Sequence, residues 1–271
     1  MKTLDTALKL LKLFETEEQT LSVTEIAEAT ALPKSKVSRL LADFRANGFL
    51  EQDEQTRRYR VGLAAFELGS NYIKSQPLAH AALPVLRQIV DRTGHSTTLS
   101  VMRGDLILHI LAVEGPHYID GRWRVGNRLP FHATSAGKVL LAGLTPAGFA
   151  AFVANRRLDP ITPSTVTDPE VFRRQIEETR SSGVSMTRGE SAPGLSAVAV
   201  PVLGRSNDTV AALGLIIPDR FFAEEETDAL TALLHEEART LSIKCGAAEY
   251  PFGTAGASPR PPLARAAGSL S

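Results

Sequence analysis

Residues 22–45, SVTEIAEATALPKSKVSRLLADFR, constrain the fold more than any other segment, because their spacing indicates two short helices joined by a tight turn. Ser22 and Glu25 make the S-x-x-E pattern of a capping box at the start of a helix. Pro33 opens the second helix, since its fixed φ suits a first turn that does not use its missing N–H. The segment therefore predicts a helix-turn-helix.

The second helix of this pair has an apolar face and a polar face. Large apolar side chains recur at i, i+3, i+4 and i+7 and must pack on the preceding helices, at Val37, Leu40, Leu41 and Phe44. The opposite face carries hydroxyls and cations, at Lys34, Ser35, Lys36, Ser38 and Arg39. Such groups contact base edges and phosphates in a major groove. We expect Ser35, Ser38 and Arg39 to reach bases and the two lysines to contact phosphates.

A basic hairpin follows this helix. A strand begins at Phe49, a polar turn covers 52–56, and residues 57–61 return with Tyr59 and Val61 on one face. This pattern is typical of a wing, so we expect three arginines on phosphates or in the minor groove: Arg57, Arg58 and Arg60. Ahead of the motif, an apolar repeat predicts a helix that closes the core of a winged helix-turn-helix domain, at Leu4, Leu8, Leu11 and Phe14.

The chain of 271 residues suits two domains of about 150 residues each. We expect the DNA-binding domain over 1–62, a linker helix over 63–77, and a second domain over 78–248. In the second domain, helices are predicted near 78–93, 136–144, 147–155, up to 182, and 223–245; strands are predicted at 97–103, 106–113, 184–187, 196–203 and 209–217. Helices at both ends of an antiparallel sheet predict an α+β sensor domain. Residues 249–271, poor in large apolar side chains, predict a disordered tail.

Composition narrows the class of protein. Lys plus Arg equals Asp plus Glu at 30 each, which argues against a protein that coats DNA without specificity. Cys245 is the single cysteine, so no intrachain disulfide and no thiolate metal site is expected. The sequence has neither a signal-peptide pattern nor an apolar run as long as a membrane span. We expect a cytoplasmic protein with no membrane partner.

Four motifs in one order resemble the IclR (isocitrate-lyase-regulator) family of bacterial transcription factors. They are LPKSKVSRLL at 32–41, YRVG at 59–62, LPFHATSAGKVLLAGL at 129–144 and GESAPGLSAVAVPV at 189–202. The resemblance implies a mixed α/β fold, in which a winged helix-turn-helix precedes an effector domain similar to GAF or PAS domains. It also implies a homodimer or homotetramer that binds a palindromic DNA operator under the control of a small metabolite. We expect control of a catabolic operon, with repression favoured over activation.

The same resemblance implies the effector site. Carried over from the family's best-known effector site, the pocket residues are Leu129, Ser135, Ala136, Thr187, Leu195, Ala197, Gly214 and Ile216. The glyoxylate and pyruvate pattern has an aspartate, a cysteine and two serines where this chain has Thr187, Ala197, Gly214 and Ile216. With fewer polar groups and more room, we expect a larger, more apolar organic acid, aromatic or alicyclic. Its carboxylate would meet the helix N-terminus near residue 135.

A loop before this pocket offers further ligand contacts. Arg122, Trp123 and Arg124 are candidate cation and stacking partners for an aromatic acid, but a subunit contact or solvent explains them equally well.

The sequence supports an enzyme less well than it supports a DNA-binding regulator. Residues 135–138, SAGK, are similar to the end of a phosphate-binding loop. That motif requires a glycine where this chain has His132, and a Ser or Thr where it has Val139. No G-x-S-x-G motif occurs, and the six histidines lack metal-site spacing, so we expect no enzyme, no cofactor and no metal. Two alternatives stay open. One is a metabolite-binding or catalytic domain whose winged helix contacts proteins, and the other is an enzyme that acts on the effector.

Overall fold

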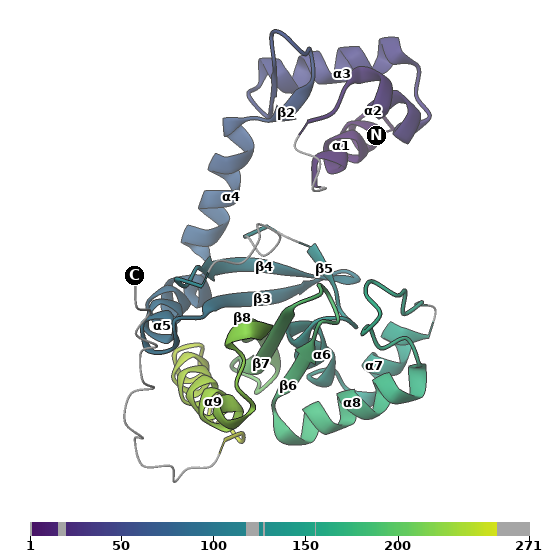
Figure 1. The fold of residues 1–271 in the computed structure, drawn as a ribbon. Helices are drawn as coiled ribbons and strands as arrows, with labels where there is room; N and C mark the ends of the chain where they lie inside the picture. The colour runs from purple at the N-terminus through teal and green to yellow at the C-terminus, as the bar shows by residue number, and fades with distance from the viewer. Residues whose placement is uncertain (1, 16–19, 118–124, 127, 155, 254–271) are drawn as a thin grey trace, which may run out of the picture. The chain divides into compact units, whose positions relative to one another are not determined.

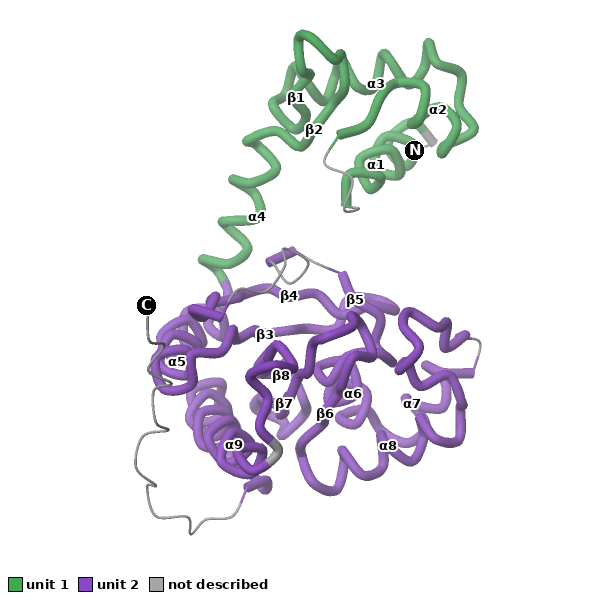
Figure 2. Tube along the Cα trace, viewed as in Figure 1, with its two compact units in different colours: residues 1–75 green, residues 76–271 purple. Residues whose placement is uncertain are grey.

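The computed structural model describes residues 2–15, 20–117, 125–126, 128–154 and 156–253. The chain forms two compact units, residues 1–75 and 76–271 (Figure 2). The loop candidates Arg122, Trp123 and Arg124, and the tail beyond Gly253, lie outside the described residues. In the described part of the chain, no helix combines the length and the apolar character that crossing a bilayer requires.

The first unit is the predicted winged helix-turn-helix. Its elements are α1 (Lys2–Leu11), the 3-10 turn η1 (Lys12–Glu15), α2 (Val23–Thr30), α3 (Lys34–Ala46), β1 (Leu50–Gln52), β2 (Tyr59–Val61) and α4 (Leu63–Ser75). The capping box forms as expected, since the Ser22 amide donates to Glu25 Oε2 at 2.7 Å and the Glu25 amide donates to Ser22 Oγ at 3.3 Å. Pro33 is the N-cap of α3.

The core of this unit lies between α1, α2, α3 and the hairpin. Val37, Leu40 and Leu41 are buried and Phe44 packs against them, as the spacing predicts. The predicted helix α1 forms, and Leu11 and Phe14 pack in the core as expected. The prediction was wrong for Leu4 and Leu8, which are 67% and 49% exposed, whereas Leu10 is fully buried. Ala7, Leu10 and Phe14 form a second stripe at helical spacing, and that stripe faces the core.

The two apolar residues of β2 differ in exposure. Tyr59 is buried, but Val61 is half exposed although both lie on the same face of β2. Val61 pairs with Leu50 at the end of a hairpin whose strands are only three residues long. The core therefore extends as far as Tyr59 and stops before Val61.

The second unit is built on a six-stranded antiparallel sheet in the order β5-β4-β3-β8-β7-β6 (Figure 1). The strands are β3 (Ser96–Arg103), β4 (Leu106–Val113), β5 (Arg128–Pro130), β6 (Ser185–Arg188), β7 (Leu195–Leu203) and β8 (Thr209–Pro218). The helices are α5 (Pro77–Thr93), α6 (Ser135–Ala142), α7 (Pro146–Val153), α8 (Pro169–Ser182) and α9 (Thr227–Lys244), with the 3-10 turns η2 (Asp219–Phe221) and η3 (Glu224–Glu226). All the predicted strands and helices of this domain are present. Among the residues that the structure describes, the short strand β5 and the 3-10 turns η2 and η3 were not expected.

The two faces of the sheet differ in side-chain size. Helix α6 packs against small side chains of the central strands, among them Ala199 and Ala212. Because neighbours on a strand alternate between faces, Val198, Val200 and Leu213 lie on the opposite face, where α5 and α9 pack. Small residues let α6 approach the sheet closely, and all eight of its residues are buried.

Residues 249–253 correct the prediction of a tail that is disordered from residue 249. Tyr250 is only 8% exposed, and its hydroxyl lies 2.9 Å from His235 Nδ1 on α9. Arg239 of α9 donates to the carbonyl of Phe252 at 3.0 Å. The two aromatic rings at 250 and 252 therefore fix this segment to α9, which the Ala- and Gly-rich composition of the surrounding sequence did not indicate.

Candidate nucleic-acid interface and effector cavity

The polar face of α3 lies open to solvent. Val37, Leu40 and Leu41 hold the helix to the core, and the side chains predicted to contact DNA all stand on its exposed surface: Lys34, Ser35, Lys36, Ser38 and Arg39. Pro33 makes no side-chain cap bond, so the first turn presents backbone N–H groups beside two lysines. N–H groups and cations together favour a phosphate.

The hairpin arginines have three different surroundings. Arg58 Nη2 lies 2.8 Å from Glu25 Oε2, and its Nε and Nη2 also donate to Thr20 Oγ1 and the Thr20 carbonyl, each at 2.9 Å. Arg60 Nη2 lies 2.9 Å from Glu51 Oε2 across the hairpin. Arg57 is exposed at the turn, where its φ of 58° is left-handed. Arg58 thus ties the hairpin to α2, while Arg57 and Arg60 point to the surface.

Local hydrogen bonds keep two acidic groups of this unit charged. The Ser22 amide, assisted by Arg58, holds the pKa of Glu25 below its usual value. The Thr56 amide, which donates to Asp53 Oδ1 at 2.7 Å, likewise lowers the pKa of Asp53 in the hairpin turn. Charged carboxylates at these positions preserve the Arg58 contact and the shape of the turn.

A small cavity in the second unit lies between the start of α6 and the sheet. Six of the eight predicted effector residues line it: Ser135, Ala136, Thr187, Ala197, Gly214 and Ile216. Leu129 instead packs in the apolar cluster with Ile107 and Val139, and Leu195 begins β7 outside the lining. The cavity volume is about 20 Å³. A water molecule needs roughly 10–15 Å³, so the cavity has room for about one.

The structure adds five lining residues that the sequence did not single out. They are Thr98, His109, Thr134, Ser191 and Leu215. Thr98 and His109 lie on strands whose positions were predicted, so alternation alone places them on a face, but only the sheet order shows that this face meets α6. None of the described lining residues is Asp, Glu, Lys or Arg. Hydroxyls, one imidazole and backbone groups supply the polarity.

The first turn of α6 presents backbone donors at this cavity. Thr134 caps the helix, accepting from the Gly137 amide at 3.2 Å, and its carbonyl accepts from the Lys138 amide at 3.0 Å. The amides of Ser135 and Ala136 precede the first helical acceptor and have none within the helix. A Cβ at Gly137 would overlap the backbone of Phe131, so glycine is required for the helix to start here.

Among the described residues of the lining, His109 is the one titratable side chain. Its Nδ1 lies 2.7 Å from Ser100 Oγ, and both residues are buried on neighbouring strands. Burial lowers the pKa of His109 to about 4, so the imidazole is neutral at physiological pH.

A buried ion pair fixes the loop that carries Ser191. Lys138 of α6 is 1% exposed, and its Nζ lies 2.7 and 2.8 Å from the two carboxylate oxygens of Glu190. Burial lowers the pKa of Lys138, while Glu190 acts in the opposite direction. Thr165 Oγ1 donates to the Glu190 carbonyl at 2.7 Å, and Thr162 Oγ1 donates to the Gly189 carbonyl at 2.6 Å. The loop is thus held from two sides.

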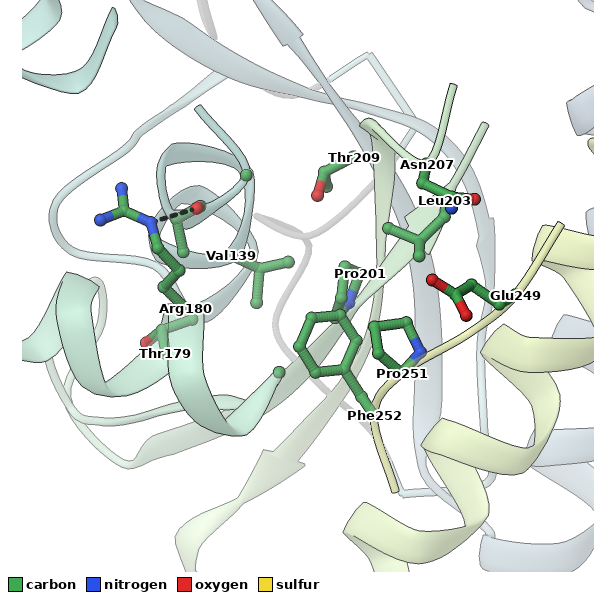
Figure 3. A pocket seen from close by; sticks show the side chains of 13 residues that line it. Val139, Thr179, Arg180, Pro201, Leu203, Asn207, Thr209, Glu249, Pro251 and Phe252 are labelled. Carbon is green, nitrogen blue, oxygen red and sulfur yellow. Dashed lines mark hydrogen bonds between the residues drawn. The ribbon is translucent and has the colours of Figure 1, made fainter. Parts of the chain in front are cut away.

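A second cavity, of about 190 Å³, lies at the other end of α6 (Figure 3). Val139, Pro201 and Phe252 form its apolar centre, and Thr209, Asn207 and Glu249 lie at its margin (Figure 3). Arg180 Nε donates to the Ala142 carbonyl at 3.0 Å beside it. Residues 249–252 form one wall, so this cavity exists because that segment folds onto the domain.

Comparison with known proteins identifies both units. The family model described as the C-terminal domain of bacterial IclR transcriptional regulators matches residues 70–243, and that of the IclR helix-turn-helix domain matches residues 3–54. The transcriptional regulator BhcR of Paracoccus denitrificans is 30% identical over 243 residues, which cover 90% of this chain and 87% of BhcR. The transcriptional repressor AllR of Klebsiella pneumoniae is 29% identical over 249 residues, covering 90% of this chain and 89% of AllR.

Solved structures agree in fold. An IclR regulator from Alicyclobacillus acidocaldarius superposes with a TM-score of 0.81 at 27% identity, covering 91% of this chain and 99% of that one. An IclR homologue from Microbacterium hydrocarbonoxydans, crystallised with 4-hydroxybenzoate, gives a TM-score of 0.78 at 26% identity, covering 90% and 98%. These matches agree with the exposed polar face of α3 and with the sheet-and-helix domain that follows it in the sequence. They establish that the chain belongs to the IclR family of DNA-binding transcriptional regulators.

Proposed function

We propose that the protein acts in the cytoplasm as a homodimer or homotetramer that binds a palindromic operator, and that an organic acid in the cavity beneath α6 changes its affinity for that operator. It regulates transcription and catalyses no reaction. Repression is favoured over activation, because AllR, a relative over most of both chains, is named as a repressor.

The exposed face of α3 supports the DNA contact. Ser35, Ser38 and Arg39 project from the side of the helix opposite its buried stripe, so they can enter a major groove without disturbing the core. Lys34, Lys36, Arg57 and Arg60 are exposed cations around that face. Arg58 contributes mainly by holding the hairpin against α2 through Glu25. Two such domains related by a twofold axis fit two half-sites.

The cavity is the observation that carries the effector assignment. The cavity is lined by Ser135 and Ala136, whose amides have no acceptor within the helix, and by several hydroxyl side chains. A carboxylate is the ligand group that helix N-terminal amides favour. Ala197 has a small side chain and Gly214 has none, so the sheet side of the cavity leaves space for a ligand. An aromatic acid suits that wall, and the 4-hydroxybenzoate complex of the Microbacterium homologue shows one in a protein of this fold.

The small volume of the cavity suggests how binding is linked to DNA affinity. Room for about one water is far less than an aromatic acid needs, so an effector must displace α6 or the loop at 189–194 from the sheet. A ligand shifts the balance between two arrangements by no more than its difference in affinity for them. A tenfold preference therefore changes operator affinity by at most tenfold for each effector molecule bound.

The test is genome-wide binding of the purified full chain to fragmented DNA of its source, with and without aromatic and aliphatic acids. We expect enrichment of palindromic fragments that one class of acid abolishes or strengthens. Calorimetry with the same acids then checks direct binding. Tight binding of glyoxylate or pyruvate, with none of any aromatic acid, would contradict the ligand class.

Two other functions predict different results. A winged helix that contacts proteins would show DNA affinity that barely changes with salt, whereas displacement of several counterions makes log K fall steeply with log salt. An enzyme acting on the effector would convert the acid during incubation. We expect a steep salt dependence and recovery of the acid unchanged.

A further inference from the structure

The sheet wall of the effector cavity carries one paired imidazole. His109 of β4 and Ser100 of β3 are register partners, and the imidazole Nδ1 lies 2.7 Å from the serine hydroxyl. Both residues are at least 95% buried. Because Ser100 engages Nδ1, Nε2 is the ring nitrogen through which His109 would contact a ligand in the cavity it lines.

The Ser100 hydroxyl allows the imidazole Nε2 to act either as a hydrogen-bond donor or as an acceptor toward a ligand. When the hydroxyl donates to Nδ1, the proton of the neutral ring is on Nε2, which is then a donor. When the hydroxyl accepts from Nδ1, Nε2 is an acceptor. A ligand hydroxyl, which both donates and accepts, is satisfied by both tautomers. A methyl group is satisfied by neither.

The rest of this wall is less polar. Thr98 on β3 pairs with Gly214 on β8, and Ala197 on β7 pairs with Ile216. A Cβ at Gly214 would lie 3.5 Å from Thr98 Oγ1, so the missing side chain keeps this row open beside the Ser100–His109 row. The amides of α6 lie on the helix side of the same cavity. The two walls therefore offer different chemistry, anion-binding amides on one and a neutral imidazole on the other.

We propose that the Ser100–His109 pair determines effector specificity by selecting acids that carry a hydroxyl group away from the carboxylate. This inference rests on the proposed function, since it assigns the carboxylate of the same effector to the amides of Ser135 and Ala136. The ligand class is a hydroxylated cyclic carboxylic acid, and His109 is the residue that distinguishes it from the unhydroxylated acid.

Burial gives the pair its discriminating power. A ligand hydroxyl can hydrogen-bond to the imidazole nitrogen at this buried position, whereas a ligand methyl group in the same place cannot. Sites that hydrogen-bond a ligand hydroxyl reject analogues lacking it far more strongly than apolar pockets reject a change of size. We therefore expect the hydroxylated acid to bind at least tenfold more tightly than its methyl counterpart.

The experiment measures dissociation constants of the full chain by calorimetry for three pairs of probes: 3-hydroxybenzoate and 3-methylbenzoate, 4-hydroxybenzoate and 4-methylbenzoate, and 4-hydroxy- and 4-methylcyclohexane carboxylate. Each pair differs by one group of similar size. The wild type should prefer the hydroxyl member of at least one pair tenfold or more. His109→Leu should lose that preference while still binding the methyl member, and His109→Asn, which keeps hydrogen-bonding groups, should retain part of it. Ser100→Ala should reduce the preference.

Thermal unfolding of each variant separates specificity from folding, and His235→Leu is the matched control. His235 is also a buried histidine, but it contacts Tyr250 and lies outside the cavity lining, so its loss should leave the preference unchanged. The preference of the wild type can be measured even if a variant fails to fold. Equal binding of both members of every pair by the wild type, or equal losses for both members in His109→Leu, would overturn the specificity role alone. Absence of binding by every acid, and of any effect on operator affinity, would overturn the proposed function as well.

Discussion

Lys138 and Glu190 form an ion pair in the interior of the second unit, with the ammonium nitrogen 2.7 and 2.8 Å from the two carboxylate oxygens. Removing one partner of a buried pair leaves the other charge unpaired, at a cost of about 3–5 kcal/mol. Glu190→Leu should therefore lower the free energy of unfolding by roughly that amount. The double variant Lys138→Met/Glu190→Leu should recover most of it, because no charge is left buried. Urea unfolding followed by circular dichroism measures both, and a double variant no more stable than the single one would contradict this account.

Arg39 and Arg57 should affect DNA binding in different ways. Arg39→Ala should weaken operator binding by about 1–3 kcal/mol and relax specificity at one base pair, because this side chain is assigned to a base edge. Arg57→Ala should weaken operator and random DNA alike and reduce the salt slope by about one. Fluorescence anisotropy with both DNAs at several salt concentrations separates these outcomes. Equal losses on both DNAs for Arg39→Ala would remove its base-reading role.

Variants of Arg58 and Glu25 test whether Arg58 has a structural role or contacts a DNA phosphate. If Arg58 mainly fixes the hairpin to α2, Arg58→Ala and Glu25→Gln should both lower the melting temperature of the first unit and both weaken DNA binding. Arg58→Ala removes the 2.8 Å contact, and Glu25→Gln removes the charge of its acceptor. If Arg58 contacts phosphate instead, Glu25→Gln should leave DNA affinity unchanged or increase it, because it releases a cation. We expect the first pattern. Anisotropy and thermal unfolding of the two variants provide the comparison.

The protein should become less stable as pH falls below neutrality. Burial lowers the pKa of His95, His109 and His235 from 6.5 to about 4 in the folded state. Between pH 6.5 and 4 the unfolded chain therefore binds more protons than the folded one, so stability rises with pH in this window. Each histidine contributes at most about 1.4 kcal/mol per pH unit. His235→Gln should show a shallower slope of unfolding free energy against pH than the wild type, whereas an identical slope would exclude His235 from this effect.

The sequence predicts the secondary structure of this protein well, because its signals are local. The capping box at Ser22, the apolar stripe ending at Phe44 and the alternation in β3 each involve neighbours along one element. Helix α1 shows the limit of such reasoning. Its leucines form two stripes at helical spacing, and only packing against α2 and α3 determines that Leu10, not Leu4 or Leu8, is buried.

The sites were predicted less completely for the same physical reason. The family resemblance supplied six of the residues that line the cavity, whereas His109 and Thr98 enter it only through the order of strands in the sheet. The contact of Arg58 with Glu25 joins residues 33 positions apart, and no spacing rule relates them. Likewise, Tyr250 finds its partner on α9 by tertiary packing, against the composition of its own segment.

Helix α6 exposes none of its eight residues, which limits how regulators of this architecture can diversify. A substitution on the helix must fit the sheet, α8 and the Glu190 loop at once, so few changes there are tolerated. The positions facing it from the strands, such as Ala197, Gly214 and Ile216, need to satisfy only the cavity and their strand neighbours. Under the proposed function, single replacements on the strands can therefore change the ligand preference while the helix stays constant.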